Sequence, residues 1–229
     1  MLATVGPDMI AIVPPHDAKD SRAISGAERW LPAGGLVFVV LFFTALVLTG
    51  ESGDNGREVL QHYTSQEGKQ IASVFLLAAS GIAYLVFVGA LRAVLATAER
   101  EPRPLSGLGF AGGVVTACLL LVTAAVLGAL TDAVGNAEHP EAFYILNSMT
   151  YPLVTFGIAA SSLLALATGI LTLRSGVLPR WVGWVSLVAA PIILIAILFI
   201  PIFGFLAWVA IISVMLLMRS GGSTRQAAA

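Results

Sequence analysis

Residues 181–218 read WVGWVSLVAAPIILIAILFIPIFGFLAWVAIISVMLLM, a run of 38 residues without a charged side chain. One straight helix of that length would measure about 57 Å, nearly twice the roughly 30 Å hydrocarbon thickness of a membrane. Pro201 lacks a backbone donor and clashes with the preceding helical turn, whereas Pro191 can simply kink a packed helix. We therefore expect two membrane spans, at about 182–198 and 205–218, with a chain reversal around Pro201.

Four further apolar runs precede this stretch, and each is close to the roughly 20 residues that a helix needs to cross a membrane. They lie at about 31–49, 71–91, 108–130 and 147–173. Charged residues make up only 11% of the 229-residue chain, against about a quarter in soluble domains, so a single water-soluble globule cannot bury the apolar excess. The sequence therefore predicts an all-α, polytopic transmembrane helical bundle of about six spans.

Polar segments flank this predicted bundle. Residues 1–30 contain three prolines and scattered charges, and we expect them to form a flexible N-terminal tail. Residues 219–229 are expected to form a second tail, so the six-span domain covers 31–218. The run at 31–49 begins too late for a cleavable signal peptide and has mixed charges before it, so we expect it to be retained as the first span.

Basic residues gather on one side of the predicted membrane. Of the 12 Lys and Arg residues, only Arg57 and Lys69 lie in the two acidic loops. The others are Lys19, Arg22, Arg29, Arg92, Arg100, Arg103, Arg174, Arg180, Arg219 and Arg225. Because cytoplasmic segments are enriched in Lys and Arg, we expect a multi-pass protein of the cell membrane, the inner membrane of a bacterium, with both termini cytoplasmic.

The interiors of the predicted spans contain no charged side chain. Intramembrane charges are typical of proton relays, ion paths and voltage sensors, so the sequence argues against a proton-coupled pump and a charge-lined pore. The net charge of −1 argues against nucleic acid as a partner. The expected partners are the lipid bilayer and a membrane protein, which can be a second copy of the chain. The sequence contains no recognisable cofactor-binding motif, so the cofactor, if there is one, stays unknown.

The fourth predicted span carries the most regular pattern. Polar and small residues recur at steps of three or four and so fall on one helical face. They are Asn147, Tyr151, Thr155, Ala159, Ser162, Ala165 and Gly169. Such a face is more often a packing seam, like the close-approach pattern Gly109-Phe-Ala-Gly-Gly113 in span three. The alternative is the wall of a pocket or solute path opened by Pro152, with Asn147, Tyr151, Thr155 and Ser162 as candidate binding residues.

The two acidic loops hold the remaining candidate residues, which are His62, Tyr63, Asp132, His139 and Glu141. Histidine and carboxylate side chains can bind zinc or act as an acid–base pair. The spacing matches neither H-x-x-x-H nor H-E-x-x-H, so no metal site is predicted. Solvated loop residues are the simpler interpretation, and His139-Pro140-Glu141 fits the start of a helix equally well.

Two capping patterns are expected around the first acidic loop. Asn55 or Asp54 can cap a short helix on which Val59 and Tyr63 share a face, and this helix is expected to lie on the membrane surface. Thr64-Ser-Gln-Glu67 matches a capping box, in which the first and last side chains accept hydrogen bonds from each other's backbone amides. This pattern predicts the start of span two.

One segment resembles a known family. The run Leu173-Arg-Ser-Gly-Val-Leu-Pro-Arg-Trp-Val-Gly-Trp184, the acidic loop after span one and the Leu91-Arg92 end of span two are similar to bacterial multi-pass proteins classed only as domain of unknown function 4386. The resemblance covers most of the chain beyond residue 30. It implies a six-span bundle, but it implies no activity, and no functional residue carries over from it.

The sequence favours a non-enzymatic integral membrane protein that binds a partner helix, a lipid or an apolar small molecule through the small-residue faces of spans three and four. The first alternative is a small permease for a neutral or apolar solute. The second is a membrane enzyme with a site at the outer face around His62, Asp132, His139 and Glu141.

Overall fold

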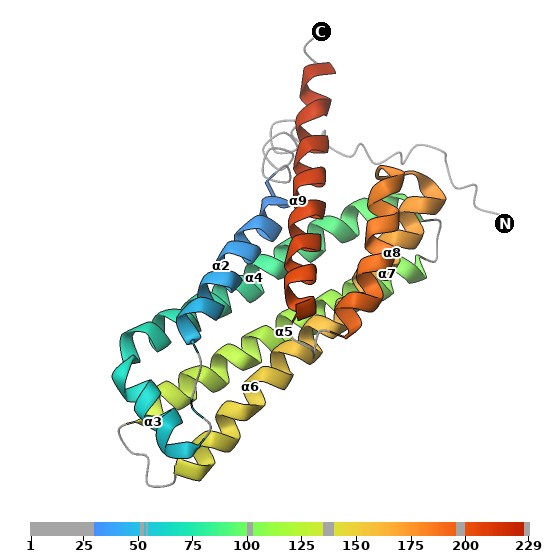
Figure 1. Cartoon of the computed structure of the whole chain (residues 1–229). Helices are drawn as coiled ribbons and strands as arrows, with labels where there is room; N and C mark the ends of the chain where they lie inside the picture. The colour runs from blue at the N-terminus through green and yellow to red at the C-terminus, as the bar shows by residue number, and fades with distance from the viewer. Residues whose placement is uncertain are drawn as a thin grey trace, which may run out of the picture.

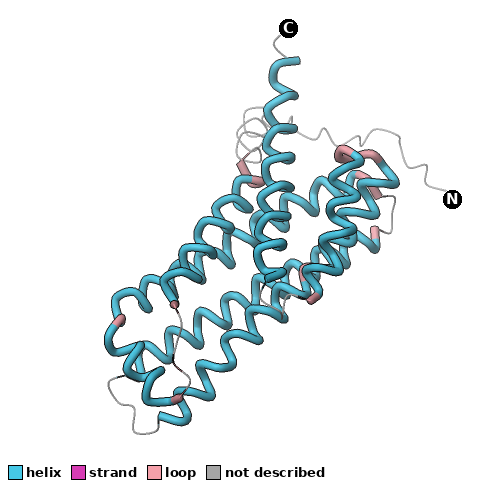
Figure 2. Tube along the Cα trace, in the orientation of Figure 1, coloured by secondary structure: helices cyan, strands magenta, loops and turns pink. Residues whose placement is uncertain are grey.

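The computed structural model describes residues 30–50, 53, 55–99, 103–134, 140–195 and 200–226. All regular secondary structure in these ranges is helical (Figures 1 and 2). The helices are α2 (Ala33–Thr49), α3 (Gly56–Ser65), α4 (Glu67–Thr97), α5 (Pro104–Ala133), α6 (Pro140–Ala160), α7 (Ser162–Ser175), α8 (Arg180–Leu194) and α9 (Ile200–Gln226). The predicted fold class, an all-α membrane bundle, is confirmed. The predicted N-terminal tail lies outside the described residues, except for Trp30.

Four of the described helical segments are long and apolar enough to cross a membrane. They are Glu67–Thr97, Pro104–Ala133, Pro140–Ser175 and Ile202–Arg219. Helices α2 and α8 are also apolar, but with 17 and 15 residues they reach only about 25 and 22 Å. The chain is therefore a helical membrane protein, and the count of six crossings stays a prediction.

The helices close into a ring. In chain order, α2 packs on α4, α4 on α5, α5 on α6 and α7, α7 on α8 and α8 on α9, and α9 returns to pack on α2 (Figure 1). One end of this ring, called the basic end here, carries Arg92, Arg103, Arg174, Arg180 and Arg219. Helix α3 lies at the opposite end, called the α3 end.

Small residues bring α5 against α6 and α7. A Cβ atom added to Gly112 would lie 2.4 Å from the carbonyl oxygen of Ala160, which is closer than real Cβ atoms come. The hydroxyl of Thr116 donates a 2.7 Å hydrogen bond to the carbonyl oxygen of Gly157 across the same contact. The small-residue segment that begins at Gly109 thus serves the close helix approach predicted for it.

The fourth predicted span is two helices, and its bounds differ from the expected ones. Helix α6 begins at Pro140. A proline is tolerated there because the N–H groups of the first turn have no acceptor within the helix, and Glu141 follows in this turn. At Ser161 the backbone N–H and the hydroxyl both donate to the carbonyl oxygen of Ile158, at 3.0 and 2.6 Å. This tighter turn separates α6 from α7, and the two helices together form the segment Pro140–Ser175, which is long enough to cross a membrane and contains the predicted span.

The stretch from 181 to 218 contains two helices with bounds other than the expected ones. Pro191 lies inside α8, and Pro201 lies in the first turn of α9, where a proline removes no helical hydrogen bond. Helix α8 has 15 residues and packs along α7, which has 14. It therefore ends near the level of Ser161, and the adjoining ends of α8 and α9 lie beside the middle of the bundle (Figure 1).

The capping prediction before α3 is confirmed, and the one before α4 is wrong. Oδ1 of Asn55 accepts a hydrogen bond of 3.0 Å from the amide of Glu58 at the start of α3. Thr64 instead stays within α3, where its hydroxyl donates to the carbonyl oxygen of Leu60 at 2.7 Å. Gln66 precedes α4, without a side-chain cap. The capping box fails because α3 extends further than the pattern assumed.

Candidate functional site

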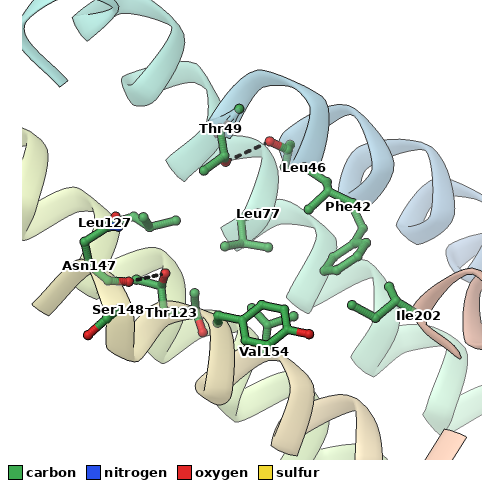
Figure 3. Close-up of a pocket in the computed structure, with 14 residues that line it drawn as sticks. Phe42, Leu46, Thr49, Leu77, Thr123, Leu127, Asn147, Ser148, Val154 and Ile202 are labelled. Atoms are coloured by element: carbon green, nitrogen blue, oxygen red, sulfur yellow. Dashed lines mark hydrogen bonds between the residues drawn. The ribbon is translucent and has the colours of Figure 1, made fainter. Parts of the chain in front are cut away.

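A cavity of about 440 Å³ opens beside the part of α6 that α8 leaves uncovered. Helices α2 and α6 form its walls, α4 and α5 contribute its base, and Ile202 at the start of α9 closes one end (Figure 3). The volume falls within the roughly 300–1,000 Å³ of sites that bind small molecules. The cavity is therefore the first candidate for a binding site.

The cavity exists because its two walls do not pack on each other. In the described part of the chain, α2 packs mainly on α4 and α9, while α6 packs mainly on α5 and α3. Helices α8 and α9 fill the space between α2 and α7 in the basic half of the bundle, but they do not extend along the α3 half, where α6 continues the line of α7. The other half of the same gap is left open, and this opening is the cavity.

Polar and apolar side chains lie at different ends of the cavity. Its α3 end carries Thr49, Asn147 and Ser148, and its deeper part is formed by Phe42, Val154 and Ile202 (Figure 3). Each wall runs over eight residues, from Phe42 to Thr49 and from Asn147 to Val154, which is about 10 Å of helix. The cavity thus resembles a short amphipathic slot, polar toward the α3 end.

Aromatic packing closes the deep end. One turn beyond Phe42, the ring of Phe38 lies 4.9 Å from that of Tyr84 and 5.8 Å from that of Phe205, between centroids. Tyr84 and Phe205 are themselves 5.7 Å apart, and all three side chains are fully buried. These rings come from α2, α4 and α9. They form a plug between the cavity and the basic end.

Two consecutive residues of α3 hold the two walls at the mouth. The hydroxyl of Tyr63 donates a 3.0 Å hydrogen bond to Oδ1 of Asn147 on α6, and Nε2 of His62 lies 3.0 Å from the carbonyl oxygen of Thr49 on α2. Burial raises the pKa of Tyr63 to about 12, so the phenol keeps its proton and remains a donor at neutral pH. Helix α3 therefore bridges α2 and α6 at the mouth of the cavity that lies between them.

The end of α2 is held by a second buried side chain. Nε2 of Gln70, on α4, donates to the carbonyl oxygen of Thr49 at 3.1 Å and lies 3.0 Å from Nε2 of His62. Gln70 is 1% exposed. The next residue, Gly50, has φ +64°, a left-handed conformation that favours glycine and lets the chain leave α2 sharply. Local structure thus fixes the α2 side of the mouth.

The structure divides the candidate residues of the fourth predicted span. Asn147 and Tyr151 line the cavity. Thr155 is buried one turn deeper, and its hydroxyl donates to the carbonyl oxygen of Tyr151 at 3.0 Å. Ser162 is half-buried at the start of α7 and is not part of the lining. The same stripe is therefore a cavity wall at one end and a packing seam at the other, where a Cβ on Gly169 would lie 2.7 Å from Leu187.

The acidic-loop candidates are spread over several elements. His62 and Tyr63 lie on α3, Glu141 is exposed at the start of α6, and Asp132 is exposed near the end of α5 beside Glu67. His139 lies outside the described residues. Within the described ranges, no three His, Cys, Asp or Glu side chains gather as metal ligands would. The loop residues that matter for the cavity are His62 and Tyr63.

Sequence reasoning did not identify the α2, α5 and α9 sides of the cavity. Phe42, Thr49, Thr123 and Ile202 line it together with the α6 residues. Helical periodicity detects a stripe on one helix, but it does not show which stripes face each other. The one sequence feature that hinted at the α2 side of the cavity was the polar residue Thr49 at the end of an apolar run. Considered alone, such a residue indicates only the end of a helix.

Comparison with known proteins identifies a family whose function is unknown. The model of a domain of unknown function, DUF4386, matches residues 33–223, from the first residue of α2 into the last turn of α9. No curated protein and no solved structure matches the chain. The match covers the ring of helices together with the cavity and α3. The chain therefore belongs to the DUF4386 family.

Proposed function

We propose that the protein binds one largely apolar molecule in the cavity between α2 and α6, and that this molecule enters from the bilayer. The observation that carries the proposal is a slot with a polar mouth, apolar walls and an aromatic plug at its deep end. A membrane lipid or an apolar small molecule has this distribution of polarity. The slot supports binding of such a molecule in a defined orientation.

A sideways entrance supports access from lipid. Two lining residues of α6, Ser148 and Tyr151, are exposed, so the cavity is open at this helix. Their surroundings are apolar, because Phe43 on α2 and Met149 and Phe156 on α6 are about half exposed. Such surfaces suit hydrocarbon chains, so the entrance between the two helices would open toward lipid.

The same geometry favours a small occupant over a partner helix. The cavity volume of about 440 Å³ lies within the range of sites that bind small molecules. The aromatic plug also favours binding over passage, because a permease needs a route to the basic end. The described residues of the lining include no acid, base, thiol or imidazole, which favours binding over enzymatic chemistry.

The orientation in the cell membrane is part of the proposal. Five of the ten basic residues that predicted cytoplasmic termini lie at the basic end of the bundle. With that end in the cytoplasm, α3 and the polar mouth face the outer side. The mouth then lies near the headgroups of the outer leaflet, and the apolar part of the slot lies at the depth of the hydrocarbon.

The test is native mass spectrometry of the protein purified from its membrane in mild detergent. The matched variants are Val154→Phe, which fills the cavity from α6, and Val122→Phe, the same change on the exposed face of α5. We expect one small molecule retained per chain by the wild type and Val122→Phe and released by Val154→Phe. Equal retention by all three proteins, or none by the wild type, would contradict the proposal.

A further inference from the structure

The polar groups of the cavity define the head of the molecule that it binds. We infer that this head is uncharged and donates a hydrogen bond, so that the occupant is an alcohol-type lipid, a hydroxyl group on an apolar body. This inference rests on the proposed binding function and adds the chemical class of the occupant to it. It follows from an inventory of the donors and acceptors in the lining.

The shortest hydrogen bond that each Ser or Thr hydroxyl of the lining donates goes to its own helix. The hydroxyls of Thr49 and Thr123 donate to the carbonyl oxygens of Ala45 and Leu119, at 2.9 and 2.8 Å. Oγ1 of Thr49 also lies 3.3 Å from Oγ of Ser73 on α4, which is a longer contact. The hydroxyls of Ser148 and Thr150 donate to the carbonyl oxygens of Ile145 and Asn147, both at 2.7 Å. A hydroxyl oxygen that donates its proton still has lone pairs to offer. The four hydroxyls therefore present acceptors to an occupant.

Backbone groups add to this excess of acceptors. Pro152 has no N–H, so it cannot donate the helical hydrogen bond that the carbonyl oxygen of Ser148, four residues earlier, would otherwise receive. The mouth also lies at the C-terminal end of α2, where the helix dipole is negative and the last carbonyls have no helical donors. Side chains already bond the carbonyl oxygen of Thr49 and that of Ala45 one turn earlier, but the negative helix end and the carbonyl oxygen of Ser148 still favour a group that donates a hydrogen bond.

Charge in the lining restricts the head further. Among the described residues that line the cavity, there is no Lys, Arg or His side chain, so a carboxylate or phosphate would enter without a cation from these residues. The same described lining holds no Asp or Glu to balance an ammonium group. An ion without a partner is costly in such surroundings. Asn147 and Tyr151 add neutral polar groups beside the acceptors, and a hydroxyl head, which both donates and accepts, suits this mixture.

The experiment measures saturable binding of three dodecyl compounds to the full chain in nanodiscs, with nanodiscs of the Val154→Phe variant as the blank. The compounds are dodecan-1-ol, its methyl ether, which accepts but cannot donate, and dodecanoate, which is anionic. We expect the alcohol to bind about fivefold more tightly than the ether, the factor that one neutral hydrogen bond contributes, and dodecanoate to bind more weakly than the alcohol.

Two matched double variants locate the effect. Thr49→Val with Thr123→Val removes two acceptors from the cavity, and we expect the ratio of alcohol to ether affinity to fall below two. Thr44→Val with Thr131→Val makes the same changes on the same two helices outside the cavity, at hydroxyls that likewise donate to their own helix. This control should keep the wild-type ratio.

The outcomes separate this inference from the proposed function. If the ether binds as tightly as the alcohol, or dodecanoate binds most tightly, the cavity is a binding site and the inferred head is wrong. A ratio that falls equally in both double variants also contradicts the inference. If none of the three compounds binds above the blank, the proposed function itself fails, and the inference fails with it.

Discussion

The hydrogen bond from the hydroxyl of Tyr63 to Oδ1 of Asn147, 3.0 Å long, joins residues that are 84 positions apart. Tyr63 belongs to the first acidic loop of the sequence, and Asn147 begins the polar stripe of α6. Together with the contact of His62 with Thr49, the bond ties α3 to both walls of the cavity. Helix α3 is therefore a structural part of the cavity mouth.

Removing this bond should loosen α3. Tyr63→Phe deletes the hydroxyl and keeps the ring, which lies 6.4 Å from the ring of Phe143. The loss is expected to be about 1 kcal/mol, so amide hydrogens of Gly56–Ser65 should exchange about fivefold faster. Hydrogen exchange followed by mass spectrometry measures this change. Tyr144→Phe, on the partly exposed face of α6, is the control, and equal exchange in both variants would refute the role of the bond.

Replacing a glycine of α5 by alanine should change the stability of the protein in opposite directions at two positions. Gly112→Ala places a methyl group 2.4 Å from the carbonyl oxygen of Ala160, so α5 and α6 must separate, at a cost of about 1–3 kcal/mol. Gly107 has open space around its Cβ position, so Gly107→Ala should stabilise the helix by up to about 1 kcal/mol. Unfolding in mixed micelles compares the two variants. Equal effects would show that α5 is not closely packed at Gly112.

The carboxyl group of Glu99 should make the free energy of unfolding depend on pH. Partial desolvation raises the pKa of its carboxyl group, but the amides of Ser106 and Leu105, each at 2.9 Å, and the charge of Arg103 outweigh this, so the pKa is lowered overall. A lowered pKa in the folded state stabilises the protein above the ordinary glutamate value of about 4.3, and this contribution disappears as the pH falls through the folded-state value.

Glu99→Gln tests that dependence. At pH 7 the variant should lose about 0.5–1 kcal/mol, the lower range for a helix cap, because the carboxylate is largely solvated. The difference in free energy of unfolding between wild type and variant should stay constant from pH 7 to about 5 and shrink below about 4.3. A difference that grows as the pH falls would contradict the assigned contacts.

Reporter fusions test the proposed orientation. A cytoplasmically active reporter on the C-terminus should be active, since α9 ends at the basic end of the bundle. The same reporter inserted after Gly53, before α3, should be inactive, and an externally active reporter should show the reverse pattern. Activity of the external reporter at the C-terminus would overturn the topology.

Features of the helices could be predicted from the sequence where interactions between residues close in the chain determine them. Asn55 caps α3 because its side chain reaches an amide three residues away. Pro201, by contrast, was expected between two helices but lies in the first turn of α9, where a proline removes no helical hydrogen bond. The break at Ser161 was not predicted, because nothing in the local pattern distinguishes Ser161 from its neighbour Ser162 or from the other hydroxyl residues of this span. The capping box at Thr64 failed because packing extends α3.

The cavity was predictable only in part. Periodicity placed Asn147 and Tyr151 on one face, and the pocket wall remained open as one interpretation of that face. Which helix faces this wall depends on the length of α8 and on the return of α9 to α2, and both are properties of the whole ring. Thr49 and Thr123 therefore could be assigned to the site only from the structure.

The most direct test of the account is an electron cryo-microscopy structure of the chain in nanodiscs made from its native membrane lipid. We predict one elongated density between α2 and α6, with its polar end beside Thr49 and Asn147 and its apolar end against Phe42 and Ile202. Direct packing of α2 on α6, with no space between Leu46 and Val154, would contradict the account.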